Sequence, residues 1–307
     1  MGLRVNLPSN YIPVFGLNES RAQYIHNAKS FDYAKIANMN KNQAKLLDSF
    51  LENSDQILNP ATKKNLLANL SSPAVAKYLK KNKTIILPIG STEQHGPDGI
   101  LGIDHLTATG IAYAVSELTG VISAPPINYG MAMHHLGFSG TIALRPTTYI
   151  NLICDVLDSL KRHGFRHVIV INGHGGNKGP FLNALAERVD EYAEMDFSFV
   201  NWWVMQGLQK NIIDKYFGAK EGYHATPTEV SVTMALVPGS MVMPKSYKCP
   251  QKEVSAENSA WVIPAKFREY YPDGVMRADY SLSTEQIGKE ALRVAIGEIV
   301  QLVENIA

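Results

Sequence analysis

The stretch LPIGSTEQHGPDGILGIDH, residues 87–105, carries the strongest structural and chemical signal in the sequence. Its first residues end a short apolar run, residues 84–89, which predicts a buried strand. The loop that follows presents Glu93, then His95, and nine residues later Asp104. Because residues two apart in extended backbone point the same way, the Glu93 and His95 side chains can converge on one point. Carboxylates and a histidine beyond the carboxyl end of a strand favour a metal site.

Asp104 stands at the start of a helix that we predict over residues 105–119, and two roles fit this position. A lone aspartate here would cap the N-terminus of the helix. Alternatively, its two carboxylate oxygens could bridge a pair of cations. The Glu-x-His pair that precedes it in the loop favours the metal role.

The rest of the main domain extends outward from this stretch. From residue 73 onward, short apolar runs alternate with amphipathic helical periods, which predicts an α/β domain with a largely parallel sheet. Residues 167–171 are almost entirely apolar, as in a strand buried on both faces. We expect strands at residues 84–89, 121–127, 167–171 and 197–203. We expect helices at residues 105–119, 149–163, 178–195, 228–236 and 284–304.

The first seventy or so residues have a different composition, rich in Asn, Lys and Ser, with one helical stretch at about residues 41–58. We therefore divide the chain into an N-terminal extension, residues 1–71, and an α/β domain, residues 72–307. The extension either lies over the main domain or a neighbouring subunit, or forms a solvated arm.

A second cluster, INGHGGN at residues 171–177, follows the buried strand. The glycines around His174 let the backbone turn sharply and approach a ligand closely. A glycine-rich loop before a helix can also cradle a phosphate, but no GxxxxGK[ST] sequence follows. Open α/β sheets place their sites at the carboxyl ends of their strands, so parallel order would bring His174 within reach of Glu93 and His95.

A third cluster is GYHATPTEVS, residues 222–231. Thr226 or Thr228 can cap the helix that begins near Glu229, and a glutamate in a first turn suits the helix dipole. Glu229 is therefore either a helix-start carboxylate or a further ligand. His224, in the preceding loop, could orient a substrate or transfer a proton near neutral pH.

The composition limits the classes of function. The 307 residues carry a formal net charge of +1, so bulk charge does not support nucleic acid or an anionic membrane as a partner. The N-terminus has no apolar run long enough for a signal peptide or a membrane span, and the expected location is the cytoplasm. Two cysteines, Cys154 and Cys249, are too few for a disulfide framework.

Together these segments resemble the creatininase family, over roughly residues 72–307. The matching segments, in chain order, are GSTEQHGP at residues 90–97 followed by Asp104, Tyr129-Gly130 with His135, FSGTIALRP at residues 138–146, NGHGGN at residues 172–177, and His224-Ala225 followed by Glu229. Two departures indicate a distinct branch with its own substrate. Creatininase has a glutamate two residues after the histidine of NGHGGN, where this chain has Gly176, and Pro227 replaces an acidic residue of the last motif.

The resemblance implies a three-layer α/β/α domain, usually assembled as a homohexamer, with one or two divalent zinc, manganese or iron ions per chain. We expect two. The metal ligands that it implies are Glu93, His95, Asp104, His174 and Glu229, with Asp104 as the bridge.

We therefore hypothesise metal-assisted hydrolysis of a C–N amide-type bond, other than a peptide bond, in a small molecule. The metals would lower the pKa of a bound water and polarise the substrate carbonyl. Catalytic roles are assigned to His224, as proton donor, and to His174 and Glu93. Substrate-binding roles are assigned to His135, to Asn177 and to the backbone amides of Gly175 and Gly176, which could stabilise an oxyanion.

Other interpretations remain open. The same cluster could open a cyclic ketone or cleave a peptide, or the chain could be a non-catalytic scaffold that keeps a metal for folding. His135 could instead hold the loop at residues 129–141 through a structural hydrogen bond. His134 matches no motif and is expected to be exposed. Trp202 and Trp203 would alternate across the last strand, with core packing expected for either.

Overall fold

Strands β1 and β3 lie at the centre of the fold. β1 (Thr84–Ile89) and β3 (His167–Asn172) pair in parallel along their whole length. β2 (Ile122–Ser123) pairs with the other edge of β1, and β4 (Asp196–Asn201) with the other edge of β3. The order within the described sheet is β2-β1-β3-β4, and every pair is parallel, as predicted.

The computed structural model describes residues 39–250 and 262–306. The first part of the predicted N-terminal extension, residues 1–38, lies outside these ranges. Within them, no helix combines the length and the apolar character that a membrane span needs.

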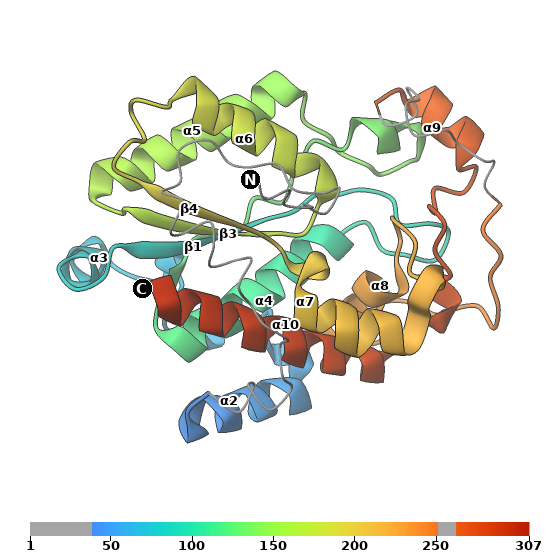
Figure 1. Ribbon diagram of the computed structural model, residues 1–307, viewed down its shortest axis with the longest axis horizontal. Helices are drawn as coiled ribbons and strands as arrows, with labels where there is room; N and C mark the ends of the chain where they lie inside the picture. Colours follow the sequence, from blue (N-terminus) through green and yellow to red (C-terminus); the bar gives the residue numbers. More distant parts are fainter. Residues whose placement is uncertain (1–38, 251–261, 307) are drawn as a thin grey trace, which may run out of the picture.

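Helices cover both faces of the sheet (Figure 1). One layer contains α5 (Pro146–His163) and α6 (Lys178–Glu187), and the other contains α4 (Ile103–Thr119), α8 (Pro227–Leu236) and α10 (Glu285–Ile306). The shorter helices are α2 (Lys41–Glu52), α3 (Ser72–Leu79), α7 (Gln206–Leu208), which continues as a π-helix (Gln209–Phe217), and α9 (Pro264–Tyr270). These three layers confirm the predicted α/β/α fold class.

Alternating side chains of the central strands fill both interfaces between sheet and helices. In β1, Ile86 packs with the residues of α4 and α10, whereas Ile85 and Leu87 pack with those of α5 and α6. β3 alternates in the same way, with Ile169 on the first side and Val168 on the second. Each such buried side chain stabilises the fold by about 1.5–3 kcal/mol, so the nearly continuous apolar runs in the sequence follow from burial on both faces.

The second predicted strand is much shorter than expected. The sequence predicts residues 121–127, but β2 ends at Ser123, and beyond it an isolated bridge joins Ile127 to Ile89. Pro125 and Pro126 lie between these pairings and have no N–H to donate to a ladder.

Two other predicted elements also end early. α6 stops at Glu187 rather than at residue 195, and the chain turns so that Tyr192 and Met195 pack into the core beside α5. β4 stops at Asn201, so Trp202 and Trp203 lie in a 3₁₀ turn and do not alternate across a strand. Trp202 is nevertheless buried in the core, as expected.

The described part of the predicted extension lies on the main domain and is not a solvated arm. Leu47 and Leu51 of α2 are buried in the core cluster that contains α4 and α10. Gln43 of the same helix donates from Nε2 to the carbonyl of Leu118, at the end of α4. The predicted helix at residues 41–58 ends at Glu52. The domain boundary at residues 71–72 stays a prediction.

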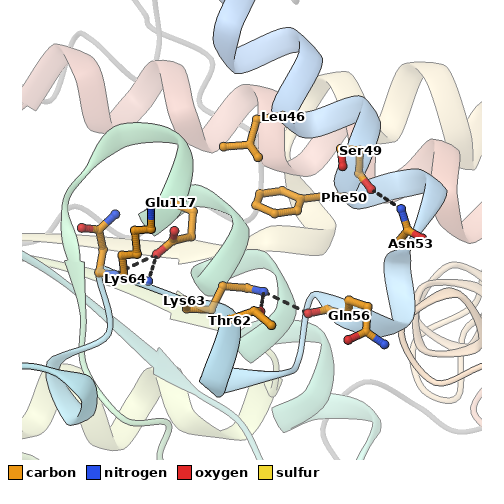
Figure 2. A pocket seen from close by; sticks show the side chains of 10 residues that line it. Leu46, Ser49, Phe50, Asn53, Gln56, Thr62, Lys63, Lys64 and Glu117 are labelled. Atoms are coloured by element: carbon orange, nitrogen blue, oxygen red, sulfur yellow. Dashed lines mark hydrogen bonds between the residues drawn. The ribbon is translucent and has the colours of Figure 1, made fainter.

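A second set of contacts joins this segment to α4 (Figure 2). The carboxylate of Glu117 accepts the backbone N–H groups of Lys64 and Asn65, each at 2.8 Å. Lys63 donates from Nζ to the carbonyl of Gln56 and to the hydroxyl of Thr62, which closes the turn that follows α2. The shallow pocket drawn there lies between α2 and α4 and is lined by none of the predicted site residues.

Two glycines let the first turn of α4 lie directly on the ends of the central strands. A Cβ at Gly90, just after β1, would overlap the backbone of His105, and a Cβ at Gly173, just after β3, would overlap the carbonyl oxygen of Asp104. This close approach brings Asp104 to the carboxyl ends of both strands.

We expect Gly173→Ala to destabilise the protein by about 1–3 kcal/mol, because the added methyl group overpacks against α4. Gly179→Ala is the matched control: it lies exposed in α6 with open space around it, and alanine there should be neutral or stabilise by up to about 1 kcal/mol. Chemical denaturation of both variants measures the difference. Equal effects of the two substitutions would contradict the close contact between α4 and β3.

Candidate metal centre

The three predicted sequence clusters meet beyond the carboxyl ends of β1 and β3. Glu93 and His95 follow β1, and His174 follows β3. Asp104 lies in the first turn of α4, and Glu229 in the first turn of α8. The first four are buried, and Glu229 is 15% exposed.

Asp104 lies between the two histidines. Its Oδ1 is 3.0 Å from His95 Nε2, and its Oδ2 is 3.1 Å from His174 Nδ1. Glu93 Oε2 lies 3.0 Å from the same nitrogen of His174, and Glu229 Oε1 lies 3.9 Å from His95 Nε2. Three groups among the described residues have metal-ligand spacing, and two of them, Glu93–Asp104–His174 and His95–Asp104–Glu229, share Asp104.

Backbone carbonyls determine which nitrogen of each histidine faces the carboxylates. His95 Nδ1 lies 3.1 Å from the carbonyl oxygen of Glu93, and His174 Nε2 lies 3.1 Å from that of Met131. Since a carbonyl can only accept, each of these nitrogens donates its hydrogen. The other nitrogen of each neutral ring therefore turns a lone pair toward carboxylate oxygens 3.0–3.1 Å away. Such an arrangement is repulsive unless a cation or a proton lies between the two.

The electrostatics of the ion-free site agree with this geometry. Burial lowers the pKa of His95, but the Asp104, Glu229 and Glu93 carboxylates outweigh it and raise the pKa to about 9. Burial also opposes charge on His174, but Glu93 and Asp104 hold its pKa well above the usual value. Burial raises the pKa of Glu229 to about 8. The Glu93 carboxyl is also buried, but His174 and His135 hold its pKa well below the usual value.

The donor set fits divalent transition metals. Within the described ranges, both carboxylate oxygens of Glu93, Asp104 Oδ2 and His95 Nε2 are buried and have no hydrogen-bond partner. Buried polar atoms normally find partners, so these orphaned atoms indicate a missing cation. Imidazole nitrogen and carboxylate oxygen together suit zinc, manganese or iron.

The helix-cap interpretations are now resolved. Asp104 does not cap α4, because the N-cap residue is Gly102. The Asp104 carboxylate instead faces His95 and His174. Glu229 does take part in a capping box, in which its Oε1 accepts the backbone N–H of Thr226 and its own N–H donates to the Thr226 hydroxyl. Glu229 therefore starts α8 and also faces His95.

His224 lies beside the two groups, at a position where the backbone is strained. The next residue, Ala225, has a φ of +54°, in the left-handed region, and the backbone of His224 pairs with Met276. The ring donates from Nε2 to the carbonyl of Gln94, and its Nδ1 lies 3.7 Å from Glu93 Oε1. Burial, helped by His135 and His95, holds the pKa of His224 well below its usual value. His224 also forms a third possible ligand group with Glu93 and His95.

The residues predicted to bind substrate fall into two sets. His135 is buried, with its Nε2 3.2 Å from Glu93 Oε1. Asn177 is also fully buried, and its amide accepts the N–H of Met131 and donates to the carbonyl of Gly90, so in the described structure it joins three loops. Gly175, in contrast, is exposed, with open space where a side chain would be.

Two aspects of the site were missed by sequence reasoning. His134 is buried and not exposed as predicted. Its ring lies tilted against that of His135, with centroids 3.9 Å apart, and edge-on to that of Phe267, with centroids 5.2 Å apart. Gln94 also contacts both His135 and His224 through its side chain. Its position in the sequence, between Glu93 and His95, gave a signal for this role. Alternation in extended backbone points the Gln94 side chain away from the side that Glu93 and His95 share.

Comparison with known proteins agrees with this site. The family model named creatininase, described as creatinine amidohydrolase, matches residues 68–303. The chain belongs to the creatininase family. It is accordingly a hydrolase of a metal-binding family. Three of the motifs that carry the resemblance, at residues 90–104, 172–177 and 224–229, supply the side chains that meet at this site.

Creatininase-family relatives have several named activities. A 3-dehydro-scyllo-inosose hydrolase of Thermotoga maritima is 27% identical over 76% of this chain and 80% of its own length. A creatinine amidohydrolase of Pseudomonas putida is 32% identical over 50% of this chain and 64% of its own length. A mycofactocin precursor peptide peptidase of Mycolicibacterium smegmatis is 35% identical over 34% of this chain and 43% of its own length.

Solved creatininase structures share the fold. One named creatininase Mn aligns with a TM-score of 0.69 at 21% identity, over 79% of this chain and 98% of that one. A mutant creatininase of Zn–Zn type aligns with a TM-score of 0.67 at 21% identity, over 80% and 98% of the two chains.

Gly176 marks a physical difference from creatininase. The sequence resemblance places a glutamate of creatininase at this position. A Cβ at Gly176 would overlap both His174 Nε2 and the carbonyl oxygen of Met131. The hydrogen bond between those two groups therefore occupies the place of a side chain. In this chain, no glutamate can enter there without displacing the partner that orients His174.

We expect zinc uptake by the metal-free protein at pH 7 to release about two or more protons per chain. The raised pKa values mean that His95 and His174 hold protons at this pH, and a metal ion must displace them. The affinity of the protein for zinc should therefore fall as the pH is lowered, because protons then compete for the two histidines. Calorimetry in buffers of different ionisation enthalpy counts the protons.

His95→Asn should release fewer protons than the wild type, whereas His163→Asn, exposed at the end of α5, is the control and should release the same number. Zinc uptake without proton release would show that these histidines do not face the ion.

Proposed function

We propose that this chain is a metal-dependent amidohydrolase that cleaves a C–N amide-type bond in a small polar molecule. The observation that carries the proposal is the position of Asp104, whose two carboxylate oxygens lie 3.0–3.1 Å from a ring nitrogen of each of two histidines. One carboxylate with an oxygen toward each histidine is the arrangement that a two-metal hydrolase needs.

Each candidate ligand has a defined place in this proposal. Glu93, Asp104 and His174 would hold one divalent cation, and His95, Asp104 and Glu229 would hold the second. When bound, zinc, manganese or iron would polarise the substrate carbonyl and lower the pKa of a water molecule. The backbone carbonyls of Glu93 and Met131 keep the two ligand histidines in the required tautomers.

His224 is the proposed proton carrier. Its Nε2–H is held on the carbonyl of Gln94, so Nδ1 is the nitrogen without hydrogen, and it faces the site beside Glu93. Burial lowers the pKa of His224 and keeps the ring neutral near pH 7, so Nδ1 is free to accept a proton. His224 Nδ1 accepts the proton that the attacking water loses and then delivers it to the leaving nitrogen.

Gly175 and Gly176 are proposed to receive the substrate oxygen. Both follow His174 directly, and Gly175 is exposed with no atom near the place of a Cβ. Their backbone N–H groups are the proposed donors to the developing oxyanion. Asn177 contributes by holding this loop against Gly90 and Met131.

A second candidate is hydrolysis of a cyclic, sugar-like ketone. It is favoured by one observation: the relative that matches over 76% of this chain is a 3-dehydro-scyllo-inosose hydrolase, whereas the creatinine amidohydrolase matches over 50%. Both reactions begin with attack of water on a carbonyl carbon. The same residues would therefore act, and the substrate pocket would decide between them.

The test is a substrate panel with zinc-, manganese- and iron-loaded protein, containing linear amides, lactams including creatinine, short peptides and inosose-type cyclic ketones. Release of an amine from an amide or lactam supports the main proposal. Turnover of the cyclic ketones alone would replace it with the second candidate. No turnover of any class by metal-loaded protein would contradict both.

Two variants separate the proton carrier from the ligands. His224→Ala should retain the metal content of the wild type and lose about 10²–10⁴-fold in kcat. His174→Ala should lose both metal and activity. Elemental analysis beside the assay distinguishes them, and loss of metal from His224→Ala would make His224 a ligand of the third group.

A further inference from the structure

Gln94 lies at the point where the two non-ligand histidines of the site meet. The ring of His135 stacks on that of His224, with centroids 4.2 Å apart. Gln94 Nε2 lies 2.8 Å from His135 Nδ1 and 3.0 Å from His224 Nε2. Its side chain is 4% exposed, so solvent does not supply its partners.

Two backbone groups fix the orientation of the Gln94 amide. Oε1 accepts the N–H of Gly96 at 2.9 Å, and Nε2 donates to the carbonyl of Gly274 at 3.0 Å. A flipped amide would place an NH₂ against an N–H and a carbonyl against a carbonyl. The approach of Gly274 is so close that a Cβ there would overlap the Gln94 amide. The amide nitrogen therefore points toward the histidines.

This orientation determines where His135 carries its hydrogen. One N–H of the amide goes to Gly274, and the other points to His135 Nδ1, which must accept it. The hydrogen of the neutral ring then lies on Nε2, which is 3.2 Å from Glu93 Oε1. His135 thus turns an N–H, and not a lone pair, toward Glu93.

The backbone of Gln94 sets His224 in the same way. Its carbonyl oxygen lies 2.8 Å from His224 Nε2. If His224 Nε2 carried no hydrogen and accepted a hydrogen bond from the Gln94 side-chain amide, its lone pair would lie against the lone pairs of the carbonyl oxygen, which is repulsive. The hydrogen therefore lies on Nε2, and Nδ1 is left bare toward Glu93.

We infer that Gln94 is a positioning residue: its side-chain amide and its backbone carbonyl together fix the tautomers of His135 and His224. His135 then turns its Nε2–H toward Glu93, and His224 presents an unprotonated nitrogen to the site. The tautomers are a property of the fold, and this inference rests on the proposed function only for the catalytic use of His224.

The test is ¹⁵N solid-state NMR of zinc-loaded protein labelled in its histidine and glutamine side chains. The wild type should show hydrogen on Nε2 and a bare Nδ1 in both rings, with a through-space cross-peak between the Gln94 amide hydrogen and His135 Nδ1. Spectra of His135→Asn and His224→Asn assign the signals. Hydrogen on Nδ1 of either ring in the wild type overturns the inference, and this measurement needs neither a variant at Gln94 nor turnover.

Gln94→Met, which keeps the length of the side chain and removes its donors, provides the second measurement. The cross-peak should disappear, the His135 Nδ1 signal should shift to that of a nitrogen without a hydrogen bond, and the Kd for zinc should rise about tenfold or more. An unchanged Nδ1 signal and an unchanged Kd would contradict the inference.

Gln43→Met is the matched control, because Gln43 is also a buried glutamine that donates to a backbone carbonyl, at the contact of α2 with α4. It should lower stability and leave the histidine signals and zinc affinity unchanged. Because no substrate is used, failure of this test is distinct from failure of the proposed reaction.

Discussion

The structure depends on one electrostatic constraint, the contact of Asp104 with His95 and His174 inside the protein. Three carboxylates, Glu93, Asp104 and Glu229, lie in the same small volume, and the first two are almost fully buried. Removing a charge from water costs several kcal/mol unless a partner compensates for it. Protons on the histidines supply that compensation in the ion-free protein, and divalent cations supply it better, because each cation also satisfies the orphaned oxygens.

The scaffold delivers these groups from rigid elements and very short loops. β1 and β3 present Glu93 and His174 at neighbouring strand ends, and α4 brings Asp104 down onto both through the gaps at Gly90 and Gly173. Ala225, whose φ of +54° lies in the left-handed region, directs the neighbouring His224 toward the same volume. Left-handed backbone at alanine costs of order 1–3 kcal/mol, and the capping box of α8 and the pairing with Met276 hold it in place.

Much of this arrangement could be predicted from sequence because it depends on local rules. Alternation in extended backbone places Glu93 and His95 on one side, and the strand-end rule brings His174 to them. The limits of β2 and β4 were missed because Pro125 and Pro126 interrupt one strand and a 3₁₀ turn ends the other. Even the double role of Glu229, helix start and site carboxylate, was present as two alternatives that turn out to be compatible.

The groups that orient the site could not be predicted, because their contacts join distant parts of the chain. Met131 reaches His174 through a backbone carbonyl, which no side-chain pattern reveals. Gln94 meets Gly274 across 180 positions of sequence. His134 is buried by Phe267, which comes from α9, far from His134 in the sequence. Periodicity and motif spacing contain no information about such pairs.

The central claim is that Asp104 is shared by two ions. It is tested most directly by anomalous scattering at the zinc edge from crystals of the zinc-loaded protein. We expect two anomalous peaks per chain, one beside Glu93 and His174 and one beside His95 and Glu229, with an oxygen of Asp104 toward each. A single peak, or peaks that do not contact Asp104, would contradict it.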